Sequence, residues 1–115
     1  MVECADHSLD LVFKAVSDPT RRAILAALEE RPATVTEIAE HFPTSLNAIS
    51  KHIKMLERAG LIHRKVSGRE HHCSLRTKPM HQAATWIEHY RQFWEVRLES
   101  LERHIMARRK KQPNR

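Results

Sequence analysis

A run of short polar and basic side chains follows Pro43, at the start of a segment with helical periodicity. The run contains Ser45, Asn47, Ser50, Lys51 and His52. At the N-terminal part of a helix, such side chains reach base edges in a major groove: an amide pairs with adenine, and an ammonium group reaches the O6 or N7 atom of guanine. We therefore predict DNA base contacts from these five residues. For Ser45, the role of helix N-cap is an equally good alternative.

A second set of basic side chains surrounds this run and suits contacts with phosphate. It consists of Arg22, Lys54, Arg64, Lys65 and Arg69. Arg69 follows Gly68 and can enter a minor groove or contact phosphate, and we predict backbone contacts for the other four. Arg22 and its neighbour Arg21 have an alternative, which is pairing with Asp18 or with glutamates. Phosphate contacts raise affinity and its salt dependence without reading sequence.

The positive charge of the chain lies in two separate zones. Residues 41–78 carry eight basic and two acidic side chains, and residues 103–115 carry six basic side chains and no acidic one. The remaining segments are acidic overall, which leaves a net charge of +6 with neutral histidine. This balance favours a polyanionic partner, either nucleic acid or an anionic membrane. Of the two, the DNA-reading pattern after Pro43 favours double-stranded DNA, and we predict no membrane partner.

Four side chains in the middle of the chain have metal-binding chemistry: His63, His71, His72 and Cys73. Imidazole and thiolate suit Zn²⁺ or Cu⁺. Alternation along a strand, however, places His71 and Cys73 on one face and His72 on the other, so the three adjacent ligands do not converge. Ordinary packing in a hairpin is the alternative, and we predict no metal and no cofactor.

The two cysteines, Cys4 and Cys73, are too few for a disulfide scaffold and fit a reducing cytoplasm. Whether they form a redox pair stays open. The sequence has neither an apolar run long enough to cross a membrane nor the pattern of a signal peptide. We therefore expect an intracellular, cytoplasmic protein.

The elements that position these residues follow from periodicity and capping signals. We predict helices over about residues 8–17, from Asp18-Pro19 to about residues 31–32, over about residues 36–41, and from Thr44 or Ser45 to Gly60. Thr34 and Glu37 have capping-box spacing. The buried stripe of the fourth helix is predicted to contain Leu46, Ile49, Ile53, Leu56 and Leu61. The short third and longer fourth helix, with a Pro-Thr-Ser turn between them, make a helix-turn-helix.

After Gly60 the apolar period changes to two. Residues 61–66 and 70–75 are predicted to form a β-hairpin with a basic tip, which is a wing. A last long helix begins near Pro79. Its apolar stripe gives the predicted dimer interface, Ile87, Tyr90, Trp94, Leu98 and Leu101, flanked by Trp86 and Phe93 and continued by Ile105. Packing of this helix on the first helix of the same chain is the alternative.

A length of 115 residues suits about one domain. We predict a mainly α fold with a small β-hairpin: a winged helix-turn-helix domain with a long dimerisation helix over residues 1–107, then a basic, disordered tail over residues 108–115. The chain has no Gly-rich phosphate loop, no Gly-x-Ser-x-Gly turn and no His-Glu-x-x-His motif, so we predict that it is not an enzyme.

Three blocks, residues 13–25, 36–40 and 50–62, resemble ArsR-type winged-helix repressors, and the resemblance runs from about residue 9 to residue 98. It implies a homodimer whose two recognition helices enter successive major grooves of a pseudo-palindromic operator, with the wings flanking them and the terminal helices paired. The positions that match a Cys-x-Cys metal pair of the family hold Ala39 and His41. His81, His89 and His104 do not reproduce the ligand spacing of its terminal-helix site.

The predicted function is therefore a homodimeric DNA-binding transcriptional regulator that represses by occupying its operator. The alternative is a sensor-repressor of the same fold that responds to a metal or to thiol oxidation. A protein-interaction module is disfavoured because the recognition helix carries Lys51, His52, Lys54 and Arg58.

Overall fold

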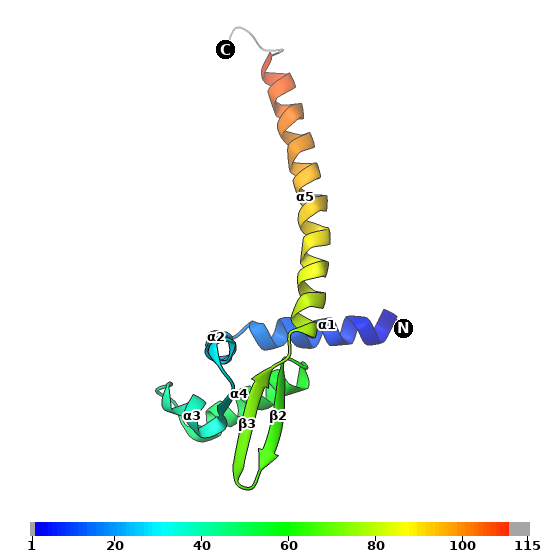
Figure 1. The fold of residues 1–115 in the computed structure, drawn as a ribbon. Coiled ribbons are helices and arrows are strands. Elements are labelled where there is room, and N and C mark those ends of the chain that lie inside the picture. The colour runs from blue at the N-terminus through cyan, green and yellow to red at the C-terminus, as the bar shows by residue number, and fades with distance from the viewer. Residues whose placement is uncertain (1, 111–115) are drawn as a thin grey trace. The chain divides into compact units, whose positions relative to one another are not determined.

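The computed structural model describes residues 2–110, with side chains from residue 8 onward, as five helices and three short strands (Figure 1). In chain order these are α1 (Val2–Val16), α2 (Pro19–Glu30), β1 (Ala33–Thr34), α3 (Val35–Glu40), α4 (Leu46–Arg58), β2 (Ile62–Ser67), β3 (Glu70–Leu75) and α5 (Lys78–Lys110). The predicted fold class, mainly α with a wing, is confirmed.

The helix starts are fixed by local caps that the sequence predicted. Asp18 precedes Pro19 and accepts a hydrogen bond from the backbone N–H of Arg21 at 3.0 Å, which begins α2. In the capping box before α3, Thr34 Oγ1 accepts from the Glu37 N–H at 3.2 Å, and Glu37 Oε1 accepts from the Thr34 N–H at 3.0 Å. These caps satisfy donors that a helix start otherwise leaves unpaired.

Helix α1 begins at Val2, earlier than the predicted start near Ser8. Apolar periodicity marks the part of a helix that packs on a core, and a helix can continue beyond that part. The buried residues of α1, Val12 and Ala15, lie in its C-terminal half. The side chain of Cys4 lies outside the described residues, and so does the open question of a redox pair with Cys73.

The sheet has one strand more than predicted. β1 pairs antiparallel with β3, and the strand order is β1-β3-β2. A strand of two residues is too short to show alternation, which is why the sequence pattern missed it. The hairpin itself is confirmed, with Ile62 opposite Leu75 and Ser67 opposite Glu70.

Gly60 ends α4 as predicted, with a φ angle of +77°. A Cβ atom at this position would lie 3.2 Å from Pro79 Cγ, at the start of α5. The glycine therefore permits both the left-handed turn and the close approach of Pro79.

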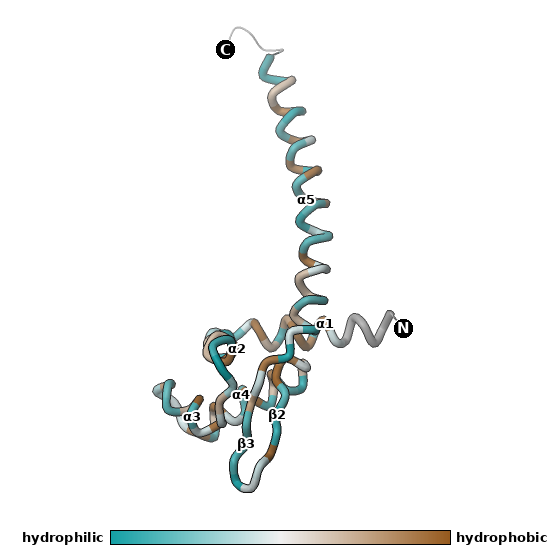
Figure 2. Tube along the Cα trace, in the orientation of Figure 1, coloured by the Kyte–Doolittle hydropathy of each residue, from teal (hydrophilic) through white to brown (hydrophobic). Residues whose placement is uncertain are grey.

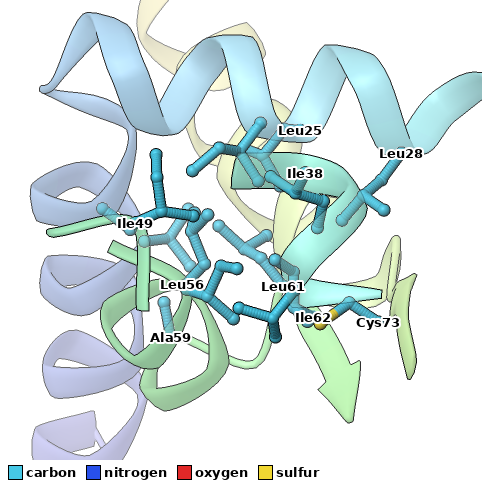
Figure 3. Packing of buried hydrophobic residues seen from close by; sticks show 14 of the residues in the cluster. Leu25, Leu28, Ile38, Ile49, Leu56, Ala59, Leu61, Ile62 and Cys73 are labelled. Atoms are coloured by element: carbon cyan, nitrogen blue, oxygen red, sulfur yellow. The ribbon is translucent and has the colours of Figure 1, made fainter. Parts of the chain in front are cut away.

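One apolar core joins the helices to the sheet. Ile24, Ile38, Ile49, Ile53 and Leu56 are fully buried together with Leu61 and Cys73. Figure 3 shows Leu25 and Leu28 of α2, Ile38 of α3 and Ile49 of α4 gathered around a shared centre with Ile62 and Cys73 of the sheet. This packing gives α4 a fixed support.

The prediction that Leu46 is buried is wrong, because its side chain is 53% exposed. Leu46 is the first residue of α4 and lies a turn before the buried part of the stripe, which begins at Ile49.

The described residues divide after Ala83 into two compact units, and most of α5 belongs to the second. Helix α5 includes residues 108–110 of the predicted tail, where three basic side chains face the negative end of the helix dipole. Residues 111–115 of that tail lie outside the described residues. Among the described helices, none is long and apolar enough to cross a lipid bilayer.

Candidate nucleic-acid interface

Helix α4 has one face in the core and one face in solvent. Ile49, Ile53 and Leu56 are buried. The opposite side exposes a row with helical spacing, which contains Asn47, Lys51, Lys54 and Arg58. The row holds an amide and three cations and no carboxylate. It is therefore chemically suited to the edges and backbone of duplex DNA.

Ser45 caps α4, since its Oγ atom accepts a hydrogen bond from the Ala48 N–H at 3.1 Å. The structural alternative for this residue is thus confirmed. The side chain is exposed, and a hydroxyl that accepts one hydrogen bond can still donate its proton to another group. Ser50, one turn further along the helix, is half-buried.

His52 is turned toward α2 rather than toward solvent. Its Nδ1 atom lies 3.2 Å from Arg21 Nη1 and 4.0 Å from Asp18 Oδ2, and the side chain is 26% exposed. The same Asp18 carboxylate has a pKa held below its usual range, mainly by the Arg21 backbone N–H, against a smaller opposing effect of burial, with the His52 and Arg21 charges contributing. These contacts link the recognition helix to the start of α2.

Arg21 and Arg22 hold the end of α1 through its backbone. Arg21 donates from Nε to the Ala15 carbonyl at 2.6 Å and from Nη2 to the Lys14 carbonyl at 2.9 Å, and Arg22 Nη1 donates to the Val16 carbonyl at 2.8 Å. Helix C-termini leave such carbonyl groups without intrahelical partners. The sequence alternatives for these arginines, phosphate or carboxylate pairing, did not include this role.

The wing presents two of its three predicted cations. Lys65 and Arg69 are exposed, and Gly68 at the tip has a φ angle of +63°. Arg64 instead lies against α4, with a side chain only 14% exposed and its Nη2 atom 3.4 Å from Glu57 Oε1. Most of the Arg64 side chain is therefore turned away from solvent, unlike those of the other two wing cations. The strand alternation that exposes Lys65 places Arg64 on the inner face.

The metal-ligand candidates are divided between the two faces of the hairpin. In the observed register Arg64 is opposite Cys73 and Lys65 is opposite His72, so Cys73 and His71 share the inner face while His63 and His72 share the outer one. His71 Nδ1 lies 3.3 Å from Arg64 Nη1. Between residues 8 and 110 no cluster of three such side chains has the geometry to hold a metal ion.

Cys73 is the inert kind of cysteine. Its side chain is fully buried, and burial raises the pKa of the thiol, with the nearby Arg64 charge opposing that rise and the Glu57 charge adding to it. A buried, protonated thiol is a poor nucleophile and a poor metal ligand.

Helix α5 carries the predicted dimer residues on an exposed apolar stripe. Ile87, Tyr90, Trp94, Leu98 and Leu101 are between 42% and 59% exposed in the single chain. Figure 2 shows apolar segments recurring along this helix. On one flank Arg91 pairs with Glu88 and Glu95, and on the other Trp86 and Phe93 extend the stripe.

Comparison with known proteins gives a consistent result. A helix-turn-helix domain family matches residues 16–65. The transcriptional repressor SdpR of Bacillus subtilis (strain 168) is 41% identical over 76 residues, which cover 66% of this chain and 84% of SdpR. The HTH-type regulator YuzN of the same organism is 36% identical over 87 residues, or 69% of this chain and 95% of YuzN.

Solved structures agree with the sequence relatives. The crystal structure of an ArsR family transcriptional regulator has a TM-score of 0.74 and 37% identity, and the match covers 78% of this chain and 93% of that one. An ArsR-like regulator from Rhodococcus sp. RHA1 has a TM-score of 0.72 and 30% identity, with 84% and 92% covered. Because relatives at this identity are covered over nearly their whole length, this chain belongs to the ArsR family of DNA-binding transcriptional regulators and is not an enzyme.

Proposed function

We propose that the protein is a homodimeric repressor that occupies a pseudo-palindromic operator, with α4 of each subunit in a major groove. The observation that carries this proposal is the row Asn47, Lys51, Lys54 and Arg58, exposed on the side of α4 opposite its buried stripe. Helix-turn-helix proteins read DNA with a helix of this kind, which is packed on the core along one face and exposes short polar or cationic side chains on the other.

Base reading falls to the N-terminal half of this helix. Asn47 pairs with adenine and Lys51 reaches guanine, while Ser45 and Ser50 donate their hydroxyl protons to nearby bases or phosphates. His52, held at Arg21, acts by fixing the orientation of α4 and has a smaller share in base contact. This assignment keeps four of the five predicted base-contact residues in their predicted role.

Phosphate contacts come from the exposed cations around the helix. Lys54 continues the reading row, and Lys65 and Arg69 extend the contact to the wing tip. Arg22 is exposed and its Nη1 atom already donates to a main-chain carbonyl, so it reaches phosphate with its remaining donors. Together these side chains supply the salt-dependent, sequence-independent part of the affinity.

Pairing of two α5 helices forms the dimer. The stripe repeats every 11 residues: Ile87 and Leu98, Tyr90 and Leu101, Trp94 and Ile105 are corresponding pairs. Eleven residues per three turns gives a nearly straight or right-handed pairing rather than a left-handed coiled coil. An exposed apolar stripe of this length is covered most simply by its own copy, related by twofold symmetry.

Repression follows from occupancy, since a dimer on its operator blocks access to that DNA. The relative SdpR, whose name describes a transcriptional repressor, supports this assignment. Selection of binding sites from random duplex DNA tests it: the selected sequences contain inverted half-sites about one helical turn apart. Selected DNA that shows no inverted repeat, or binding that does not prefer the selected DNA over random duplex at physiological salt, overturns the proposal.

A further inference from the structure

Arg64 is a charged side chain that lies between the wing and the recognition helix. It belongs to β2, opposite Cys73 of β3, on the inner face of the hairpin. Its side chain is 14% exposed, whereas the neighbouring Lys65 on the outer face is exposed. The position therefore puts a guanidinium group in the seam where the hairpin packs on α4.

Two partners from two different elements contact this guanidinium. Nη2 lies 3.4 Å from Oε1 of Glu57, near the C-terminal end of α4, and Nη1 lies 3.3 Å from Nδ1 of His71 in β3. A guanidinium group has only donors, so Nδ1 of His71 is the acceptor in this contact. The planar guanidinium group of Arg64 in β2 thus contacts both α4 and β3.

This arrangement is poorly suited to stabilising the fold. Nε and Nη2 of Arg64 are buried without a hydrogen-bond partner among the described residues. Desolvation of a guanidinium that is only partly paired offsets what the ion pair gains, and an apolar side chain of similar volume is often equally stable at such a site. A charged group in this position therefore needs a reason other than stability.

The distance between Arg64 and the tip of the wing gives a reason for a charged group at this position. The next inward-facing residue toward the tip, Val66, is 58% exposed, so the apolar seam ends near Arg64. Gly68 at the tip is four residues further along the strand, a reach of about 13 Å. A pivot of about 10° at Arg64 moves the tip by about 2 Å, enough to break a hydrogen bond between the tip and DNA.

We propose that Arg64 is a positioning residue, which sets the angle of the wing relative to α4 so that Arg69 and the recognition helix engage one duplex at the same time. Glu57 fixes the guanidinium from the helix side and His71 fixes it from the sheet side. The proposal rests on the DNA-binding function proposed above, and it adds a residue that touches neither bases nor phosphates.

A double-mutant cycle in operator binding tests this coupling. Arg64→Met keeps an unbranched side chain of similar length and removes the fork. We expect it to weaken operator binding about tenfold in the wild-type background and about twofold or less in the Arg69→Ala background, because the tip contact it positions is already gone. Losses that multiply independently, or no loss in either background, overturn the proposal.

Two further variants separate positioning from charge and from folding. Arg31→Met removes an equal charge from an exposed site at the end of α2, and we expect less than a twofold change. Arg64→Lys keeps the charge but cannot reach both partners with one planar fork, so it shows an intermediate loss that is again abolished by Arg69→Ala. It keeps the test available where Arg64→Met fails to fold.

A measurement without DNA distinguishes failure of this proposal from failure of the proposed function. In amide hydrogen exchange, Arg64→Met and Glu57→Gln accelerate exchange in β2 and β3 toward the tip by local opening, while the exchange of α2 and the global free energy of unfolding keep their wild-type values. Unchanged hairpin exchange overturns the positioning role even where operator binding is confirmed. Accelerated hairpin exchange supports the positioning role of Arg64 even where the wild-type protein shows no operator preference. The lack of operator preference overturns only the DNA-binding function.

Discussion

The Nη1 atom of Arg21 lies 3.2 Å from Nδ1 of His52, and this contact joins the first turn of α2 to α4. The same guanidinium donates to the carbonyl groups of Lys14 and Ala15, so three of its nitrogens are engaged at once. A fork held at three points transmits the placement of α1 to α4. Arg21 is therefore part of the framework that orients α4.

Replacement of Arg21 by methionine removes all three contacts and leaves two carbonyl groups at the end of α1 without these donors. We expect a loss of about 1–3 kcal/mol in the free energy of unfolding, measured by urea titration. Arg22→Met is the matched control, because its exposed side chain makes one backbone hydrogen bond and its removal costs less. Equal losses for the two variants contradict the role assigned to Arg21.

Lys51 and Arg69 are assigned different tasks in DNA binding. Lys51→Ala costs about 1–3 kcal/mol of operator affinity and relaxes base preference at one position of each half-site. Arg69→Ala weakens operator and random DNA alike and lowers the steepness of the salt dependence by about one phosphate contact. Affinity titrations at several salt concentrations, on operator and on single-base variants, measure both effects. The reverse pattern would mean that Arg69 contacts bases and Lys51 contacts phosphate.

The proposed dimer interface on α5 is tested with two substitutions of equal chemistry. Leu98→Glu places a charge on the apolar stripe and converts the dimer to a monomer, because a buried unpaired carboxylate disfavours association. Val96→Glu, two residues earlier, lies on the opposite side of the helix and leaves the mass at about twice 13.5 kDa. Analytical ultracentrifugation reads out both masses. A dimer that survives Leu98→Glu contradicts the proposed stripe.

Acid stability depends on the carboxylates that cap α2 and α3. The pKa of Glu37 is lowered, first by the Thr34 backbone N–H and then by the Thr34 hydroxyl, and the pKa of Asp18 is lowered mainly by the Arg21 backbone N–H. A lowered folded-state pKa adds stability above the unfolded-state pKa, and this stability is lost as pH falls through the folded-state value. We therefore expect the loss to begin below about pH 4.5.

Urea midpoints as a function of pH check this expectation. The wild-type protein loses stability between about pH 4.5 and pH 3, and Asp18→Asn and Glu37→Gln each flatten that decline, since neutral caps do not titrate. Asp18→Asn retains a good N-cap, so its stability at pH 7 falls less than that of Asp18→Ala. Parallel pH profiles for the wild-type protein and both neutral variants count against the capping carboxylates as the cause.

Thiol chemistry at Cys73 is predicted to be slow. The side chain is buried and its pKa is raised by burial, so at neutral pH the folded protein exposes no thiolate at this position. Iodoacetamide, followed by mass spectrometry of the peptide that contains residue 73, leaves Cys73 unmodified until urea unfolds the chain. Rapid labelling in the folded protein favours instead the thiol-responsive alternative considered from the sequence.

The features that could be predicted from sequence are those with local causes. Asp18 caps α2 through the N–H of a residue three positions later, and Thr34 and Glu37, also three residues apart, form the capping box of α3. Gly60 is required by one backbone angle, its positive φ. Strand β1 escaped prediction because two residues pair with β3 almost 40 positions later, and only tertiary packing creates that edge.

The site was predicted less completely than the fold, for the same reason. Exposure of Lys51 and Lys54 follows from the helical period alone. The buried orientation of the Arg64 side chain depends on its contact with Glu57 in another element. The position of the His52 side chain depends on its contact with Arg21, 31 residues earlier in the sequence. Charge type indicated DNA binding for all of these residues, while the long-range contacts decide which of them are exposed to solvent.

The spacing of the half-sites offers the most direct test of the central claim, which is that the α4 helices of two paired subunits read one operator. Five base pairs inserted between the half-sites of the selected operator place the second half-site on the opposite side of the duplex, about half a helical turn away. We predict that titration calorimetry finds two chains bound per selected operator, and that the insertion reduces affinity at least about 100-fold, toward that of random duplex. Equal affinity for both duplexes, or one chain bound per operator, would contradict the account.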